Sequence, residues 1–218
     1  MIEQILPSMV ATAELFDDPP GLEPHPAEAS MIAKAVEKRR KEFITARHLG
    51  REAMGKLGVE PAPIMRGERN VPLWPKGVVG SLTHCAGYRG AALAYSMQVR
   101  SIGIDAEPHE PLPDGVLDSV SLRVERKWLK TAGNDIAWDK LLFCAKEATY
   151  KAWFPLTGRW LGFEDAHITF EAGPSGTEGT FHSDLLVPGQ THSGPPLTSF
   201  DGRWVVSGDL ILTTIAVQ

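Results

Sequence analysis

The sequence of 218 residues contains only two cysteines, Cys85 and Cys144. Neither lies in a Cys-x-x-Cys pair or in a cysteine and histidine spacing that binds zinc, so a disulfide framework and a zinc finger are both excluded. Two isolated thiols are typical of a reducing compartment, and we expect a cytoplasmic protein. The first residues also lack the basic region and apolar stretch of a secretory signal.

Long apolar runs and an excess of positive charge are also missing. No uninterrupted apolar run approaches the ~20 residues that a membrane-spanning helix needs, so we expect no membrane segment. The 22 Lys and Arg against 27 Asp and Glu give a formal net charge of -5. Proteins that bind nucleic acid broadly are usually basic, so we expect no nucleic-acid partner. Hydrophobic residues at 43% and charged residues at 22% are typical of globular proteins and argue against disorder.

Glycine (21) and proline (17) are abundant, which predicts many loops and short elements. Residues 1–29 are expected to be irregular. Apolar spacing, alternation and chain breakers then predict a helix over 31–57, strands over 78–83, 91–95 and 100–107, helices over 116–129 and 138–154, and strands over 166–171, 177–187, 203–206 and 210–217. This order is that of an α+β protein, and a change of character near residues 100–108 divides the chain into halves at 1–100 and 101–218.

Two carboxylates lie one strand repeat apart in Gly103-Ile104-Asp105-Ala106-Glu107. Alternate residues of a strand share a face, so Asp105 and Glu107 lie together when Ile104 and Ala106 face the core. Such a pair repels itself unless solvent or a cation compensates, and hard oxygen ligands suit Mg²⁺ shared with a substrate phosphate. Asp-x-Glu is very common, however, and taken alone it is better explained by a solvated strand end.

The predicted helix over 138–154 carries charges among aromatic side chains. Glu147 and Lys151 are four residues apart, as are Lys146 and Tyr150, so each pair shares a helix face. A surface ion pair and the edge of a half-buried cleft explain this pattern equally well. A stripe of small residues on the same helix predicts close packing on a neighbour: Leu141, Ala145, Ala148 and Ala152.

Positive charge gathers in the first predicted helix of this acidic chain. The basic residues are Lys34, Lys38, Arg39, Arg40, Lys41, Arg47 and Arg51. Clustered arginines suit phosphate oxygens, although a solvated helix face is the commoner outcome of a charge run. Further along, Ser81, Thr83 and His84 place two hydroxyls and an imidazole at a strand end, where they could donate to phosphate. A Cys85 nucleophile is disfavoured, because neighbouring strand residues point to opposite faces and His84 is then badly placed to activate it.

In series, these segments resemble the 4′-phosphopantetheinyl transferases of the surfactin-synthetase-activating type. The resemblance rests on Gly80-Ser81-Leu82-Thr83-His84, Gly103-Ile104-Asp105-Ala106-Glu107 and Lys146-Glu147-Ala148-Thr149-Tyr150-Lys151-Ala152. It covers most of residues 30–170, and the stretch 143–170 is similar to the actinobacterial branch. The resemblance implies an enzyme that moves the 4′-phosphopantetheine arm of coenzyme A to a serine of an apo acyl or peptidyl carrier protein and releases 3′,5′-ADP. It also implies a monomeric pseudo-dimer of two similar α+β halves with the active site between them.

The resemblance implies a role for each matching residue. Asp105, Glu107 and Glu147 would hold Mg²⁺, or Mn²⁺, against the pyrophosphate. Glu147 would also be the general base toward the carrier serine, and Lys151 would favour the leaving phosphate. The implied coenzyme A contacts are Arg39, Arg47 and His84 at the 3′-phosphate, Arg66 at the adenine with Ser81 and Thr83 nearby, Lys146 and Lys151 at the pyrophosphate, Tyr150, and Trp160 with Phe143 along the pantetheine arm.

The adenine-side loop departs from the family's Lys-Gly-x-x-Gly-x-Pro pattern at two positions. Arg66 replaces the lysine and keeps its charge but not its shape. Asn70 replaces the second glycine, and asparagine tolerates left-handed backbone better than most residues. Two other functions stay open at this point. One is a non-catalytic module that binds coenzyme A or a nucleotide, and the other is a metal-dependent phosphoester hydrolase.

Overall fold

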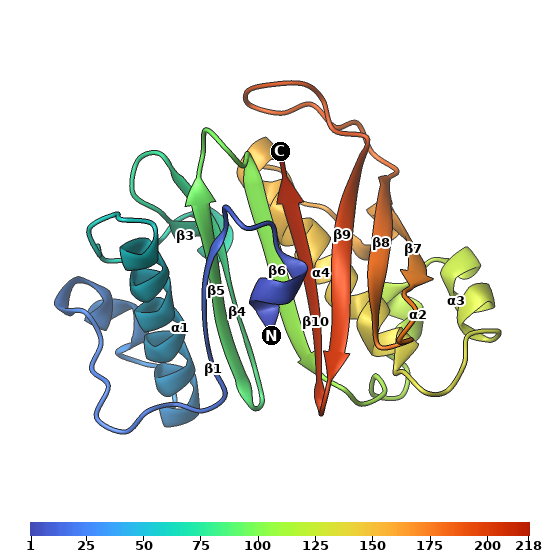
Figure 1. Cartoon of the computed structure of the whole chain (residues 1–218), viewed down its shortest axis with the longest axis horizontal. Helices are drawn as coiled ribbons and strands as arrows, with labels where there is room; N and C mark the ends of the chain where they lie inside the picture. Colours follow the sequence, from blue (N-terminus) through green and yellow to red (C-terminus); the bar gives the residue numbers. More distant parts are fainter.

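The structure, a computed structural model, describes residues 1–218 and contains two halves, each with a β-sheet and a 20-residue helix packed on it (Figure 1). The first half holds β1 (Ala11–Leu15), α1 (Glu37–Lys56), β4 (Val78–Cys85) and β5 (Tyr88–Tyr95), with the short hairpin β2 (Met65–Arg66) and β3 (Pro72–Leu73). The second half holds β6 (Ser101–Pro108), α4 (Trp138–Thr157), β7 (Ala166–Ala172), β8 (Glu178–Leu185), β9 (Ser199–Ser207) and β10 (Leu210–Val217). The α+β class with two sheet-containing halves is confirmed.

The sheet of the first half has the order β1-β5-β4, with α1 against β5 and β1. The prediction of an irregular chain over 1–29 was wrong at β1, which pairs antiparallel with β5 from Ala11–Leu93 to Leu15–Arg89. A strand this short whose partner lies far along the chain leaves little local pattern. Residues 26–32 also form a 3₁₀ helix with Pro26 at its start, where the missing N–H of proline costs nothing, and α1 begins at Glu37 rather than near 31.

The sheet of the second half has the order β6-β10-β9-β8-β7, and α4 crosses behind β6 and β10 in Figure 1. The helix predicted over 116–129 is divided in two, α2 (Leu117–Val120) and α3 (Arg123–Leu129), because Ser121 between them is extended. Helix α4 continues past Pro155 and ends at the left-handed Gly158, whose N–H donates to the Phe154 carbonyl at 2.8 Å. No helix of the structure is long and apolar enough to span a bilayer.

The two halves meet where β4 lies beside β6, and side-chain hydroxyls join these two strands. Ser81 Oγ accepts the Ile104 N–H at 3.2 Å, and Thr83 Oγ1 accepts the Ala106 N–H at 3.0 Å. Both bonds advance in the same direction along the two strands, so β4 and β6 run parallel. Buried N–H groups need partners, and the hydroxyls of β4 supply them at this seam.

Helix α4 lies unusually close to β6, and Gly103 permits this approach. A Cβ at Gly103 would lie 2.0 Å from the Ala148 carbonyl oxygen and 2.8 Å from the Ala152 nitrogen. The predicted stripe of small residues is confirmed, because Ala145, Ala148 and Ala152 are all fully buried. This contact places the polar residues of α4 over the seam between the halves.

Candidate active site

A cavity of about 500 Å³ opens between the halves, and residues from α1, β2, β4 and α4 line it. It contains many of the residues that the sequence singled out: Arg39, Arg47, Arg66, Ser81, His84, Glu147, Tyr150 and Lys151. It also contains Phe43 and Arg69, which sequence reasoning missed. Phe43 fitted the apolar period of a helix, and Arg69 is one of several charged residues in a loop, so neither carried a distinctive signal.

Arginine side chains gather at the α1 end of the cavity around the ring of Phe43. The Arg47 guanidinium lies 3.4 Å from the centre of this ring and that of Arg66 lies 4.8 Å from it. Arg47 is buried, and its Nε donates to the Ile64 carbonyl at 2.9 Å. Burial, together with the charges of neighbouring arginines, lowers the pKa of Arg47 to about 10, so it stays charged at neutral pH. Concentrated, partly desolvated positive charge favours an anionic ligand.

Arg51, which the sequence placed in the same basic group, has a different partner. Its guanidinium donates to Glu28 Oε1 at 2.7 Å, and Glu28 is fully buried. Arg51 does not line the cavity. Of the arginines of α1, Arg39 and Arg47 therefore line the cavity, whereas Arg51 lies outside its lining and is neutralised by Glu28.

His84 lies beside Arg39 at the cavity wall. Arg39 Nη1 lies 2.5 Å from His84 Nε2. Burial lowers the pKa of His84 to about 4, and the positive charges of Arg39 and Lys151 act in the same direction. The imidazole is therefore neutral at pH 7 and accepts the hydrogen bond from Arg39. Its other ring nitrogen, Nδ1, lies 3.5 Å from Glu42 Oε2.

Replacing His84 by glutamine is expected to make the protein less sensitive to acid. In the unfolded chain the pKa of histidine is about 6.5, so the unfolded state binds a proton between about pH 6.5 and 4 that the folded state does not. The free energy of unfolding of the wild type therefore falls over this range, by about 3 kcal/mol at most. Glutamine lacks this loss, and urea unfolding of both proteins at pH 7 and 4.5 measures it. Equal losses in the two proteins would contradict the half-buried, neutral state of His84.

Three carboxylates approach one another at the α4 end of the seam. Asp105 is 6% exposed, and its Oδ1 receives Lys151 Nζ at 2.6 Å, while its Oδ2 is buried without a hydrogen-bond partner. Burial raises the pKa of both Glu107 and Glu147, and the negative charge of Asp105 raises both further. Glu147 lines the cavity, whereas Asp105 and Glu107 lie outside its lining.

These carboxylates do not form a ready-made coordination sphere, because no group of three or more His, Cys, Asp or Glu is arranged to hold a metal ion. The chemistry of the group nevertheless fits a divalent cation. Its donors are hard carboxylate oxygens, one of which is buried and unpartnered, and burial together with the negative charge of Asp105 raises the pKa of Glu107 and of Glu147. Lys140 Nζ forms an ion pair with Glu107 Oε2 at 3.7 Å and partly offsets this rise in the pKa of Glu107.

Lys146 has partners other than a substrate phosphate. Its buried ammonium pairs with Glu125 at 2.8 Å and donates to the carbonyls of Phe163 at 2.5 Å and Ala166 at 2.9 Å. An ammonium has three protons, so these acceptors use all of them. In this structure the Lys146 ammonium joins α4 to α3 and to the chain before β7, and its pyrophosphate contact stays a prediction.

A second, smaller cavity of about 90 Å³ shares Glu147 and Tyr150 with the first. Trp160 lines it, and its ring lies 5.0 Å from that of Tyr150. Phe143 lines neither cavity and stacks on Phe163 at 5.7 Å. Trp160 and Tyr150 therefore border the small cavity, and Phe143 lies outside both cavities.

The adenine-side loop keeps a left-handed turn without its second glycine. Asn70 has a φ of 65° and Arg69 a φ of 52°, so the expectation that asparagine sustains the turn is confirmed. Ser81 lines the cavity but Thr83 does not, and the hydroxyls of both accept backbone N–H groups of β6.

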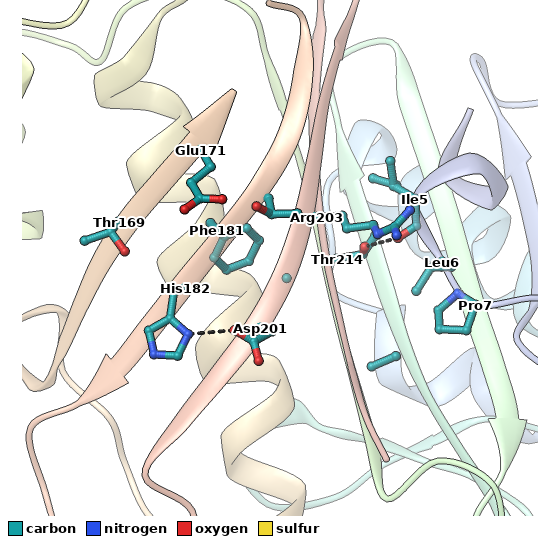
Figure 2. Close-up of a pocket in the computed structure, with 13 residues that line it drawn as sticks. Ile5, Leu6, Pro7, Thr169, Glu171, Phe181, His182, Asp201, Arg203 and Thr214 are labelled. Atoms are coloured by element: carbon teal, nitrogen blue, oxygen red, sulfur yellow. Dashed lines mark hydrogen bonds and ion pairs between the residues drawn. The ribbon is translucent and has the colours of Figure 1, made fainter. Parts of the chain in front are cut away.

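A further concavity of about 520 Å³ lies on the open face of the second sheet, away from α4. Figure 2 shows His182 pointing at Asp201, with His182 Nδ1 2.6 Å from Asp201 Oδ1, and Arg203 on the neighbouring part of β9. None of the predicted site residues lines it. One polar face is ordinary for an antiparallel sheet, so we place the functional site in the cavity between the halves.

Comparisons with known proteins cover both halves of the chain. Residues 27–94 match the 4′-phosphopantetheinyl transferase N-terminal domain, and residues 101–201 match the 4′-phosphopantetheinyl transferase superfamily. The 4′-phosphopantetheinyl transferase Npt of Nocardia iowensis is 63% identical over 99% of both chains. The 4′-phosphopantetheinyl transferase PptT of Mycobacterium tuberculosis is 58% identical over 100% of this chain and 98% of its own. The 4′-phosphopantetheinyl transferase Svp of Streptomyces mobaraensis is 48% identical over 100% of this chain and 89% of its own.

Proposed function

Because this chain belongs to the 4′-phosphopantetheinyl transferase superfamily and is a 4′-phosphopantetheinyl transferase, we propose that it moves the 4′-phosphopantetheine arm of coenzyme A to a serine of apo acyl and peptidyl carrier proteins. The products are the holo carrier and 3′,5′-ADP, and the reaction depends on Mg²⁺ or Mn²⁺. The enzyme acts as a monomer in the cytoplasm, and its two free cysteines suit that compartment. The chain has two units. Residues 1–100 supply the phosphate and adenine contacts, and residues 101–218 contain the cation site.

One observation carries this proposal. A single cavity between the halves is lined by Arg39, Arg47, Arg66 and His84 of the first half and by Glu147 and Lys151 of α4 in the second. A substrate with a separate phosphate and a pyrophosphate matches this division of charge. Arg39, Arg47 and His84 hold the 3′-phosphate, and Arg66 borders the adenine together with the loop that contains Asn70.

Asp105, Glu107 and Glu147 are the residues that would hold the divalent cation. When bound, this ion neutralises charge on the pyrophosphate and makes its phosphorus more electrophilic. The unpartnered Asp105 Oδ2 and the raised pKa values of the two glutamates support this assignment. Phosphoryl-type transfer needs placement and charge neutralisation more than covalent catalysis, which suits a site without an activated protein nucleophile.

Glu147 is the general base of the reaction. It takes the proton from the carrier serine as the serine oxygen bonds to the phosphorus that carries the pantetheine arm. The bond from this phosphorus to the bridging oxygen breaks, and its electron pair leaves with 3′,5′-ADP, whose new charge the Lys151 ammonium stabilises. A buried carboxylate with a raised pKa is a stronger base than an exposed one.

The test of this function is carrier labelling. The protein is incubated with coenzyme A, Mg²⁺ and several purified apo carriers, and mass spectrometry measures the gain of one phosphopantetheine on the carrier. An excess of EDTA should abolish the gain. No gain on any carrier would contradict the proposal. Steady release of 3′,5′-ADP without a carrier would indicate a hydrolase, and nucleotide binding that is indifferent to Mg²⁺ and produces no holo carrier would indicate a binding module.

Replacing Arg39 by alanine is expected to impair the use of coenzyme A but not of 3′-dephospho-coenzyme A. Loss of a charge-assisted hydrogen bond costs about 1.5–3 kcal/mol, so kcat/KM for coenzyme A should fall by about 10- to 100-fold. Lys38→Ala is the control, because Lys38 is an exposed neighbour outside the cavity. Steady-state kinetics with both substrates measures the difference. Equal losses for the two substrates would exclude Arg39 from 3′-phosphate recognition.

A further inference from the structure

We infer that Thr83 is a positioning residue for the cation site, because its hydroxyl, which comes from the first half of the chain, orients the Asp105 carboxylate of the second half. The inference rests on the proposed function in one respect, namely that Asp105 is a ligand of the divalent cation. Resemblance placed Thr83 near the nucleotide, but Thr83 does not line the cavity where the nucleotide would lie. The atoms around its hydroxyl indicate a different role.

The Thr83 hydroxyl contacts two consecutive residues of β6. Its Oγ1 accepts the Ala106 N–H at 3.0 Å and donates to Asp105 Oδ1 at 3.3 Å. Thr83 is 3% exposed, so water does not compete for either bond. Because the N–H of Ala106 occupies one lone-pair direction, the single hydroxyl proton is left to point at the carboxylate. One hydroxyl thus holds the backbone and the side chain of neighbouring residues together.

The Asp105 carboxylate is held at one oxygen only. Oδ1 receives both the Thr83 hydroxyl and Lys151 Nζ, whereas Oδ2 is buried and has no partner. Two donors on Oδ1 fix the plane of the carboxylate and leave Oδ2 as the oxygen without a donor. Residues that hold a ligand carboxylate in this way typically matter nearly as much for metal affinity as the ligands themselves.

Lys151 alone does not keep this orientation through a reaction cycle. Its ammonium also donates to the Ile104 carbonyl at 3.0 Å, lies on a flexible stem and lines the cavity. In the proposed reaction it turns toward the leaving phosphate. Thr83 has no proposed contact with the substrate, so its hydroxyl still donates to Asp105 Oδ1 when the substrate is bound.

The chain offers a matched control two residues earlier on the same strand. Ser81 Oγ accepts the Ile104 N–H at 3.2 Å, which is the same kind of bond across the same seam. Ser81 is also buried, and it donates to no carboxylate. Removing either hydroxyl therefore leaves one N–H of β6 without its partner, and only the removal at Thr83 also frees Asp105.

The test measures the binding of Mn²⁺ alone, without coenzyme A or carrier, by the electron paramagnetic resonance signal of the free ion. The proteins are the wild type, Thr83→Val, Thr83→Ser, Ser81→Ala and Asp105→Asn, each checked for folding by circular dichroism. We expect Thr83→Val to weaken Mn²⁺ binding by about 10-fold or more, since loss of such a partner typically costs about 10- to 100-fold. Thr83→Ser keeps the hydroxyl and should bind as the wild type does. Ser81→Ala should lower thermal stability without weakening Mn²⁺ binding, and Thr83→Ala replaces the valine variant if the latter does not fold.

The outcomes separate this inference from the cation site itself. Unchanged Mn²⁺ binding by Thr83→Val would overturn the role of Thr83 while leaving the site in place. Equal weakening in Thr83→Val and Ser81→Ala would also overturn it, because the cause would then be a loosened seam. No Mn²⁺ binding by the wild type, or equal binding by Asp105→Asn, would overturn the proposed cation site and this inference together.

Discussion

Replacing Glu147 by glutamine is expected to lower the turnover of carrier labelling by about 10²- to 10⁴-fold, the range that a general base contributes. Glutamine keeps the size of the side chain but cannot take the proton of the carrier serine. It also removes one of the three carboxylates that would hold the cation. Glu147 lines both the large cavity and the small one beside it, so no other glutamate is in a position to replace it.

The same substitution is expected not to destabilise the protein. Burial and the nearby Asp105 raise the pKa of Glu147 above that of an unfolded chain. For such a group the folded state holds its proton more tightly, so the free energy of unfolding falls as pH rises through the two pKa values. At pH 7 the ionised Glu147 therefore costs stability, and Glu147→Gln should unfold at the same temperature as the wild type or a higher one.

Labelling kinetics, measured with Mg²⁺, and thermal unfolding, measured in metal-free buffer, quantify these two effects on the same preparation. Glu52→Gln is the control, because Glu52 is a half-exposed carboxylate on α1 that pairs only with Lys56 at 3.0 Å. It should leave both turnover and stability nearly unchanged. Turnover of Glu147→Gln within about threefold of the wild type would remove Glu147 from the role of base, since a general base contributes at least about 10²-fold.

Local periodicity predicted the parts of the site that a single element presents. Asp105 and Glu107 are two residues apart on β6, and Glu147 and Lys151 are four apart on α4, so each pair could be placed on one face from spacing alone. Spacing does not predict which of these groups form hydrogen bonds or ion pairs with one another. Spacing cannot say that Lys151 reaches across to Asp105, because that contact depends on how closely α4 packs on β6.

The contacts that spacing did not predict share one physical cause, which is that a partner lay far along the chain. Lys146 lines the small cavity together with Glu147 and Tyr150, yet its ammonium pairs with Glu125 of α3. Thr83 looked like a phosphate donor because it precedes His84, yet its hydroxyl is used by β6. Hydroxyl and ammonium groups bind whichever acceptor tertiary packing brings near, and a one-dimensional pattern does not contain that information.

Replacing Gly103 by alanine is expected to lower the free energy of unfolding by about 3 kcal/mol or more, at or above the upper end of the usual cost of overpacking. The new Cβ would lie 2.0 Å from the Ala148 carbonyl oxygen and 2.8 Å from the Ala152 nitrogen. Both are backbone atoms of α4, which cannot turn aside as a side chain can. Helix α4 must therefore move away from β6, and Glu147 moves with it. The folded fraction should accordingly lose most of its turnover as well.

Urea unfolding measures this loss, and Gly55→Ala is the matched control. Gly55 lies in α1, and a methyl group on its Cα would have no heavy atom from elsewhere in the protein within 4 Å, so alanine there should raise the free energy of unfolding by about 0.5–1 kcal/mol. The two substitutions add the same atoms and are expected to shift the urea midpoint in opposite directions. Equal midpoints for Gly103→Ala and the wild type would mean that α4 can shift at little cost. The close packing of α4 on β6 would then not depend on a glycine at this position.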